Sequence, residues 1–162
     1  MDLRETTDTI VIHCSRTPPG MDIGVDKITE WHKERGFDTI GYHFVIRRDG
    51  TIETGRDQEA VGTHAVAVNG TSLGVCLIGG ADRNMKWENN FAPIQFETLK
   101  TLLMKLKKDY TIKKIIGHYE VDDKKECPSF DIPKWLKKAN LVDDNKECLS
   151  FNIPKWLKKT NL

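Results

Sequence analysis

The stretch LGVCLIGG, residues 73–80, limits the fold more than any other part of the sequence, because it holds no charged residue. A short, continuously apolar run of this kind is typical of a central strand that is covered on both faces. Strands and helical segments alternate along the rest of the chain, which indicates a mixed sheet with helices packed on it. We therefore predict an α/β fold: a single domain in which a central mixed β-sheet of about five strands is flanked by helices.

Other patterns supply the remaining elements of this sheet. The run TDTIVIHCS is rich in β-branched residues and predicts a first strand. Two alternating runs on either side of Asp49-Gly50 predict a hairpin with a tight turn. Pro93 suits the first turn of the longest helix, and Gly36 suits the end of a shorter one. The expected elements are a strand at 7–15, a helix at 25–36, a hairpin at 41–55, a helix at 93–110 and a strand at 113–118.

Alternation along these strands predicts which side chains share a face. In the first strand, His13 should point to the side opposite Cys14, so the two cannot both reach one metal ion. In the hairpin, Tyr42 should lie on the same side as Phe44, with His43 on the other. We expect Cys14 to be a buried core thiol, and the same holds for Cys76 in the central apolar run.

Composition excludes several classes of protein. The 162 residues suit one domain with a sizeable core, and a net charge of +1 argues against a general affinity for nucleic acid. No apolar run is long enough for a signal peptide or a membrane span. The four cysteines form no C-x-x-C pair, which favours free or metal-bound thiols made in a reducing cytoplasm over disulfides.

The C-terminus contains a tandem duplication. Residues 121–141 and 142–162 match at 17 of 21 positions, so we divide the chain into a main domain, 1–141, and an appended duplicate helical segment, 142–162. Cys148 is the second copy of Cys127, but Leu149 replaces Pro128. We expect the second copy to pack as an extra surface helix. The alternative is that the two copies compete for one docking site and either cysteine binds the metal.

Four residues far apart in the chain could assemble into one site: His13, Tyr42, His118 and Cys127. Two imidazoles and a thiolate are good ligands for zinc, and a catalytic zinc needs three protein ligands with one position left for water. Each residue also has an ordinary structural explanation, since a histidine at a strand end is often only hydrogen-bonded. The local spacing from His118 to Cys127 is not a short zinc signature.

Several stretches, taken in order, resemble the zinc N-acetylmuramoyl-L-alanine amidases, in particular the T-seven-type phage lysozymes. They are IVIHCSRT, ITEWHKERG, GYHFVIRRDGTIETGRD, AVGTHA, SLGVCLIGG, HYEV and CPSFD. The resemblance implies one Zn²⁺ held by His13, His118 and Cys127, with Tyr42 and a lysine assisting catalysis. That lysine is Lys125 when counted back from Cys127, whereas Lys124 stays open because the loop is one residue longer than expected.

The resemblance also implies a substrate and a route to it. The loop around His64 and Asn69 should line a groove for peptidoglycan, and the bond cleaved should be the amide between N-acetylmuramic acid and L-alanine. A monomeric endolysin made in the host cytoplasm would reach the wall after release by a membrane-perforating partner. Two alternatives stay open: a module that recognises peptidoglycan without cutting it, and a lysozyme that also binds and inhibits the RNA polymerase of the phage.

Overall fold

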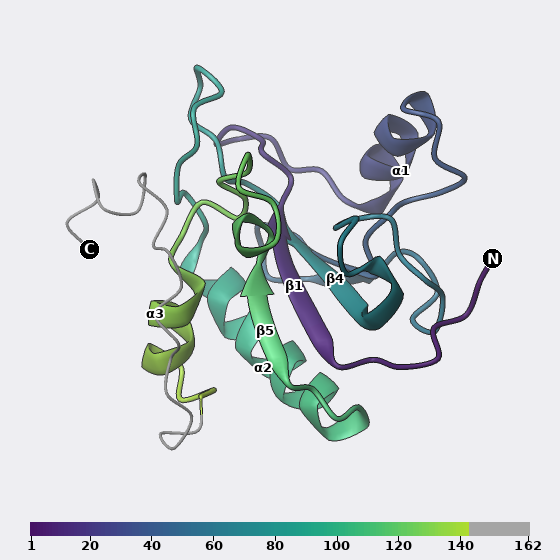
Figure 1. Ribbon diagram of the computed structural model, residues 1–162. Coiled ribbons are helices and arrows are strands. Elements are labelled where there is room, and N and C mark those ends of the chain that lie inside the picture. Colours follow the sequence, from purple (N-terminus) through teal and green to yellow (C-terminus); the bar gives the residue numbers. More distant parts are fainter. Residues whose placement is uncertain (143–162) are drawn as a thin grey trace.

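The computed structural model, which describes residues 1–142, is built around a five-stranded sheet with the strand order β3-β2-β4-β1-β5 (Figure 1). All neighbouring strands are parallel except the edge hairpin pair β2 and β3, so the predicted mixed sheet is confirmed. The strands are β1 (Thr9–Cys14), β2 (Phe44–Ile46), β3 (Ile52–Thr54), β4 (Ser72–Leu77) and β5 (Lys114–Gly117).

Three α-helices and two short 3₁₀ helices complete the described chain. They are α1 (Val25–Glu34), α2 (Pro93–Asp109), α3 (Ile132–Lys138), η1 (Asn69–Thr71) and η2 (His118–Glu120). None of the helices within residues 1–142 combines the length and the apolar character needed to cross a membrane. The first copy of the tandem duplication supplies α3, whereas the helix expected from the second copy lies outside the described residues.

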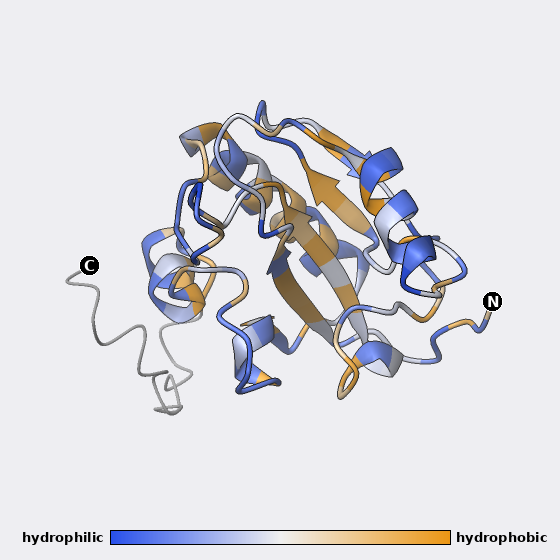
Figure 2. Cartoon of the chain, turned by 90° about the horizontal axis from the view of Figure 1, so that it is seen from above, coloured by the Kyte–Doolittle hydropathy of each residue, from blue (hydrophilic) through white to orange (hydrophobic). Residues whose placement is uncertain are grey.

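The sheet is covered on both faces, as the central apolar run predicts. One face packs against α1 through a small cluster that includes Ile28, Val45 and Cys76. The other face packs against α2 and α3 through a larger cluster that includes Cys14 and Leu103. Hydropathy colouring shows the apolar residues concentrated on the strands and polar residues on the outer surfaces of the helices (Figure 2). Cys14 and Cys76 are therefore core thiols, as expected from the sequence.

Two local predictions for the hairpin are wrong. Tyr42 does not share a face with Phe44: it packs in the cluster on the α1 face, because regular strand geometry begins only at Phe44 and alternation does not apply before it. The turn also uses three residues and not two. Arg47 N donates to Thr51 O, and Gly50 adopts a left-handed conformation with φ of 86°, which a glycine accommodates without steric cost.

A buried glutamine joins the longest helix to the sheet. Gln95 is fully buried in the first turn of α2, and its Nε2 donates to the carbonyls of Ile46 (3.3 Å) and Ile78 (3.0 Å) at the ends of β2 and β4. Its Oε1 accepts from Ala92 N at 2.9 Å, which satisfies an amide at the start of the helix. This side chain therefore fixes the position of α2 against the carboxyl ends of two central strands.

Replacing this side chain tests that connection. We expect Gln95→Leu to lower the free energy of unfolding by about 2–4 kcal/mol, because Ile78 O and Ala92 N lose a hydrogen-bond partner and Ile46 O keeps only Ile78 N. Urea unfolding in the presence of a chelator measures the change without a contribution from bound metal. Glu97→Leu, at an exposed position of the same helix, is the matched control and should change the free energy by less than about 0.5 kcal/mol. Equal stability of the two variants would contradict this role of Gln95.

Candidate metal centre

Three of the residues singled out in the sequence converge at the carboxyl ends of two parallel strands. His13 is the next-to-last residue of β1, and His118 directly follows β5, the parallel neighbour of β1. Because Ile12 pairs with Gly117, the following residues of the two strands lie side by side, and their imidazole ring centroids are 4.7 Å apart. Cys127 reaches the same place from the loop between η2 and α3.

The ligand atoms of His13, His118 and Cys127 all lie within 4.8 Å of one another. Around one zinc ion, with bonds of about 2.0–2.3 Å, tetrahedral ligand atoms lie roughly 3.3–3.8 Å apart. The observed cluster is therefore within about 1 Å of a bound arrangement, and small rotations of the side chains close the difference. Two nitrogens and one sulfur are a donor set that zinc prefers, so the residues present fit this metal.

The loop that carries Cys127 is held against β1 by main-chain groups. Cys14 N donates to Cys127 Sγ at 3.1 Å, and Tyr119 N donates to the carbonyl of Cys127 at 3.0 Å. The sulfur lies 3.9 Å from Nδ1 of His13. A hydrogen bond donated to sulfur stabilises the thiolate, which is the form that binds a metal.

Burial sets the charge of the site. It lowers the pKa of His13 well below its ordinary value, with smaller contributions from His64 and His118, and it lowers the pKa of His64 to about 3. Both imidazoles are therefore neutral near pH 7 and keep a lone pair for a metal or a hydrogen bond. Burial also raises the pKa of the Cys127 thiol. A buried thiolate needs a cation beside it, and a divalent metal meets that requirement.

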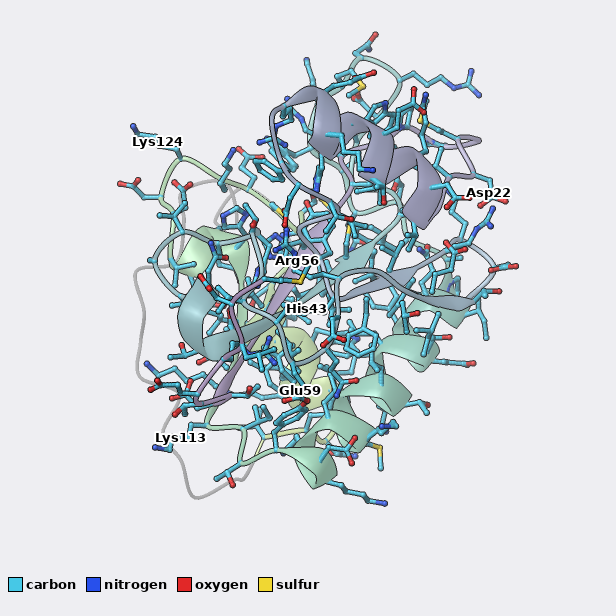
Figure 3. All side chains as sticks on the ribbon, turned by 90° about the vertical axis from the view of Figure 1, so that its right-hand side faces the viewer. Asp22, His43, Arg56, Glu59, Lys113 and Lys124 are labelled. Atoms are coloured by element: carbon cyan, nitrogen blue, oxygen red, sulfur yellow. The ribbon has the colours of Figure 1, made fainter. Side chains whose placement is uncertain are left out.

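Of the two candidate lysines, Lys125 has an electrostatic effect on one of the candidate ligands. Burial is the main cause of the lowered pKa of His118, and the Lys125 ammonium lowers it further, against an opposing effect of Asp122. Both lysines are exposed, but Lys124 lies at the outer edge of the molecule with its side chain directed away from the sheet (Figure 3). Both observations support Lys125, and its role as the catalytic lysine remains a prediction.

Tyr42 reaches the cluster from the α1 face of the sheet. Its ring centroid lies 5.0 Å from that of His13 and 5.2 Å from that of His32. Burial raises the pKa of its phenol well above the ordinary value. The hydroxyl therefore keeps its proton at neutral pH and can donate a hydrogen bond into the site.

The residues expected to bind substrate, His64 and Asn69, have partners inside the protein. His64 Nδ1 lies 2.9 Å from Nε2 of His13, and its ring stands edge-on to that of His13. Asn69 Oδ1 accepts from the backbone N–H groups of His64 (2.9 Å) and Ala65 (2.8 Å). Their contact with substrate remains a prediction. The contact between His64 and His13 was missed from the sequence, because no local spacing relates a loop residue to a strand residue 51 positions away.

A His-His-Cys cluster at the carboxyl ends of parallel strands, able to hold a metal ion, is typical of the active site of an α/β metalloenzyme. The model of one family, described as N-acetylmuramoyl-L-alanine amidase, matches residues 3–130, and the chain belongs to this family. The resemblance seen in the sequence is thereby confirmed.

Three relatives show how far the similarity extends. The chain is 50% identical to the endolysin of Klebsiella phage KP32 and 49% identical to that of Escherichia phage T7, in each case over 139 residues that cover 86% of this chain and 91% of the relative. Among solved structures, it resembles the endolysin N-acetylmuramoyl-L-alanine amidase LysCS from Clostridium intestinale URNW. That similarity has a TM-score of 0.74 and 34% identity, and it covers 88% of this chain and 90% of that one.

The tandem copies of the cysteine provide a direct test of the ligand set. We expect Cys127→Ser to lose stoichiometric zinc, because a serine hydroxyl is a poor zinc ligand and the remaining two imidazoles bind weakly. Cys148→Ser is the matched control, with the same change one repeat later, and it should retain one zinc per chain. Zinc content measured by elemental analysis after dialysis separates the two. Stoichiometric zinc in Cys127→Ser would instead favour the alternative in which either cysteine binds the metal.

Proposed function

We propose that this protein is a zinc-dependent endolysin that cleaves the amide bond between the lactyl group of N-acetylmuramic acid and L-alanine in peptidoglycan. The observation that carries the proposal is the convergence of His13, His118 and Cys127, whose ligand atoms lie within 4.8 Å of one another. Three protein ligands are the number found in catalytic zinc sites, where one position stays available to water or substrate. Family membership and the similarity to phage endolysins supply the bond and the polymer.

When bound at these ligands, zinc supplies a Lewis acid that polarises a carbonyl and makes water more acidic. The chain's own residues have separate tasks. The Lys125 ammonium stabilises negative charge that develops on the carbonyl oxygen. The Tyr42 hydroxyl, protonated at neutral pH like any phenol, with its pKa raised further by burial, orients the attacking water or passes a proton through its Oη. Overall, water adds to the carbonyl carbon, the carbon–nitrogen bond breaks, and the nitrogen leaves as the amine of L-alanine after it takes a proton.

The rival class is a module that recognises peptidoglycan without cleaving it. All three ligands are present here, His13 and Cys127 are buried, and main-chain hydrogen bonds support the cysteine. A recognition module has no need for that arrangement, so the geometry favours the enzyme. We further propose that the catalytic domain extends over residues 1–141, and that the protein acts from the host cytoplasm after a membrane-perforating partner gives it access to the wall.

Wall lysis should depend on the metal and should release defined chemical ends. We expect the turbidity of Gram-negative cells stripped of their outer membrane to fall on addition of the protein, to stay constant with a chelator, and to fall again after zinc is restored. The products should carry new L-alanine amino termini and lactyl carboxyl groups, with no new reducing sugar ends. New reducing ends would indicate a glycosidase, and intact walls that retain the protein would indicate a recognition module.

The two lysines form a matched pair for testing oxyanion stabilisation. We expect Lys125→Met to lower kcat by about 100-fold, which is the low end of the loss when one donor to an oxyanion is removed. Lys124→Met, with the same change one residue away, should lower it less than about threefold, because an exposed side chain directed into solvent adds little. Steady-state kinetics on soluble muropeptides, with zinc content measured in both variants, checks this. The reverse order of losses would assign the role to Lys124.

A further inference from the structure

We propose that His64 is a positioning residue that fixes the proton of His13 on Nε2, so that His13 offers Nδ1 to the metal. The inference rests on the proposed metal centre, and it gives His64 a role inside the protein that is separate from the contact with substrate predicted from the sequence. It follows from a chain of four groups that runs from a backbone carbonyl to the metal ligand: Val68 O, Ser72 Oγ, the His64 ring and the His13 ring.

The first link fixes the direction of the chain. Ser72 Oγ lies 2.7 Å from the carbonyl oxygen of Val68. A carbonyl oxygen only accepts hydrogen bonds, so the single hydroxyl proton of Ser72 is donated to Val68. The serine oxygen then remains as an acceptor, and Nε2 of His64 lies 3.3 Å from it. His64 therefore carries its ring proton on Nε2.

The second link transfers this preference to the metal ligand. A neutral imidazole has one N–H and one acceptor nitrogen, so Nδ1 of His64 is an acceptor. It lies 2.9 Å from Nε2 of His13, which must donate. Nδ1 of His13 is then free of a proton, and it is the nitrogen that lies 3.9 Å from Cys127 Sγ. The hydrogen bond thus selects the ligand atom before any metal arrives.

The His64 ring is held in place by the backbone around it. A Cβ at Gly74 would lie 2.7 Å from Cγ of His64, and a Cβ at Gly62 would lie 2.5 Å from its Cδ2. Only glycine lets the main chain approach the ring this closely. Asn69 Oδ1 accepts from the N–H of His64 and fixes the start of the loop. An imidazole packed in this way has a defined orientation, which a positioning residue requires.

The zinc affinities of the wild type and of two His64 variants test the proposed hydrogen-bond chain. We expect His64→Leu to bind zinc about 10- to 100-fold more weakly than the wild type, as is usual when the hydrogen-bond partner of a histidine ligand is lost. His64→Asn should recover most of the affinity, because its Oδ1 is attached at the position of the lost Nδ1 and still accepts from His13. Competition with a chromophoric chelator measures all three. Equal affinity of the wild type and His64→Leu would overturn the proposal.

A matched control separates this effect from the loss of any buried imidazole. His43 is buried beside His64, with ring centroids 5.7 Å apart, but its Nδ1 accepts from Gly74 N and its Nε2 lies 2.9 Å from Ala60 O. His43→Asn keeps the acceptor for Gly74 and leaves the hydrogen bond between His64 and His13 intact. It should therefore bind zinc within about threefold of the wild type. A loss in His43→Asn as large as in His64→Leu would overturn the specific role of His64.

A spectroscopic measurement reads the proton position directly. In the ¹⁵N-labelled metal-free wild type, long-range ¹⁵N–¹H correlation spectra should show His13 with a protonated Nε2 and a bare Nδ1. His64→Leu should show a mixture of both forms, and Ser72→Ala, which leaves the His64 ring in place, should shift the populations in the same direction. A proton on Nδ1 of His13 in the wild type would overturn the proposed role of His64, even if His64→Leu failed to fold.

The failure of this inference differs from failure of the proposed function. If the wild type lyses walls with zinc and His64→Leu binds zinc as tightly as the wild type, only the positioning role of His64 is contradicted. If the wild type binds no zinc, the proposed metal centre itself is contradicted.

Discussion

The parallel pairing of β1 with β5 is the constraint on which the rest of the site depends. The register that places Ile12 opposite Gly117 also places His13 beside His118, although 105 residues separate them in the chain. Burial of β1 between β4 and β5 holds this register, because a slip by one residue would turn His13 into the apolar core on the other face. The hydrophobic pattern of the strands thus fixes the register, and the register places the two candidate histidine ligands side by side.

Burial has a second consequence, because it decides the charge of each group in the site. The same exclusion of water keeps the imidazole of His13 neutral, raises the pKa of the Tyr42 phenol further above neutrality, and disfavours a thiolate unless a cation is present. The neutral imidazoles therefore offer their lone pairs, and a cation is still needed to stabilise the Cys127 thiolate. Lys125, by contrast, is exposed, so its ammonium keeps its hydration.

The sequence was sufficient to predict the sheet and the three residues of the candidate metal cluster, but not the details that depend on tertiary contact. Alternation correctly separated His13 from Cys14, because β1 is regular throughout its length. The same rule failed for Tyr42, since a residue outside a regular strand takes its direction from the contacts around it. Counting along a loop of altered length left Lys124 and Lys125 open, and two observations support the second: the effect of the Lys125 charge on the pKa of His118, and the outward direction of Lys124. No sequence pattern encodes a tautomer, which depends on a serine and a histidine from another part of the fold.

The hydrogen bond from Cys14 N to Cys127 Sγ has a property that side-chain contacts lack. A main-chain amide cannot be removed by exchanging the side chain attached to it, apart from a change to proline. Position 14 is therefore free to vary in response to core packing while the support of the sulfur persists. Because the contact depends on the position of the backbone and not on a side chain, it should persist through much divergence in sequence. A designer who transfers the three ligands to another protein must therefore also copy the end of the strand.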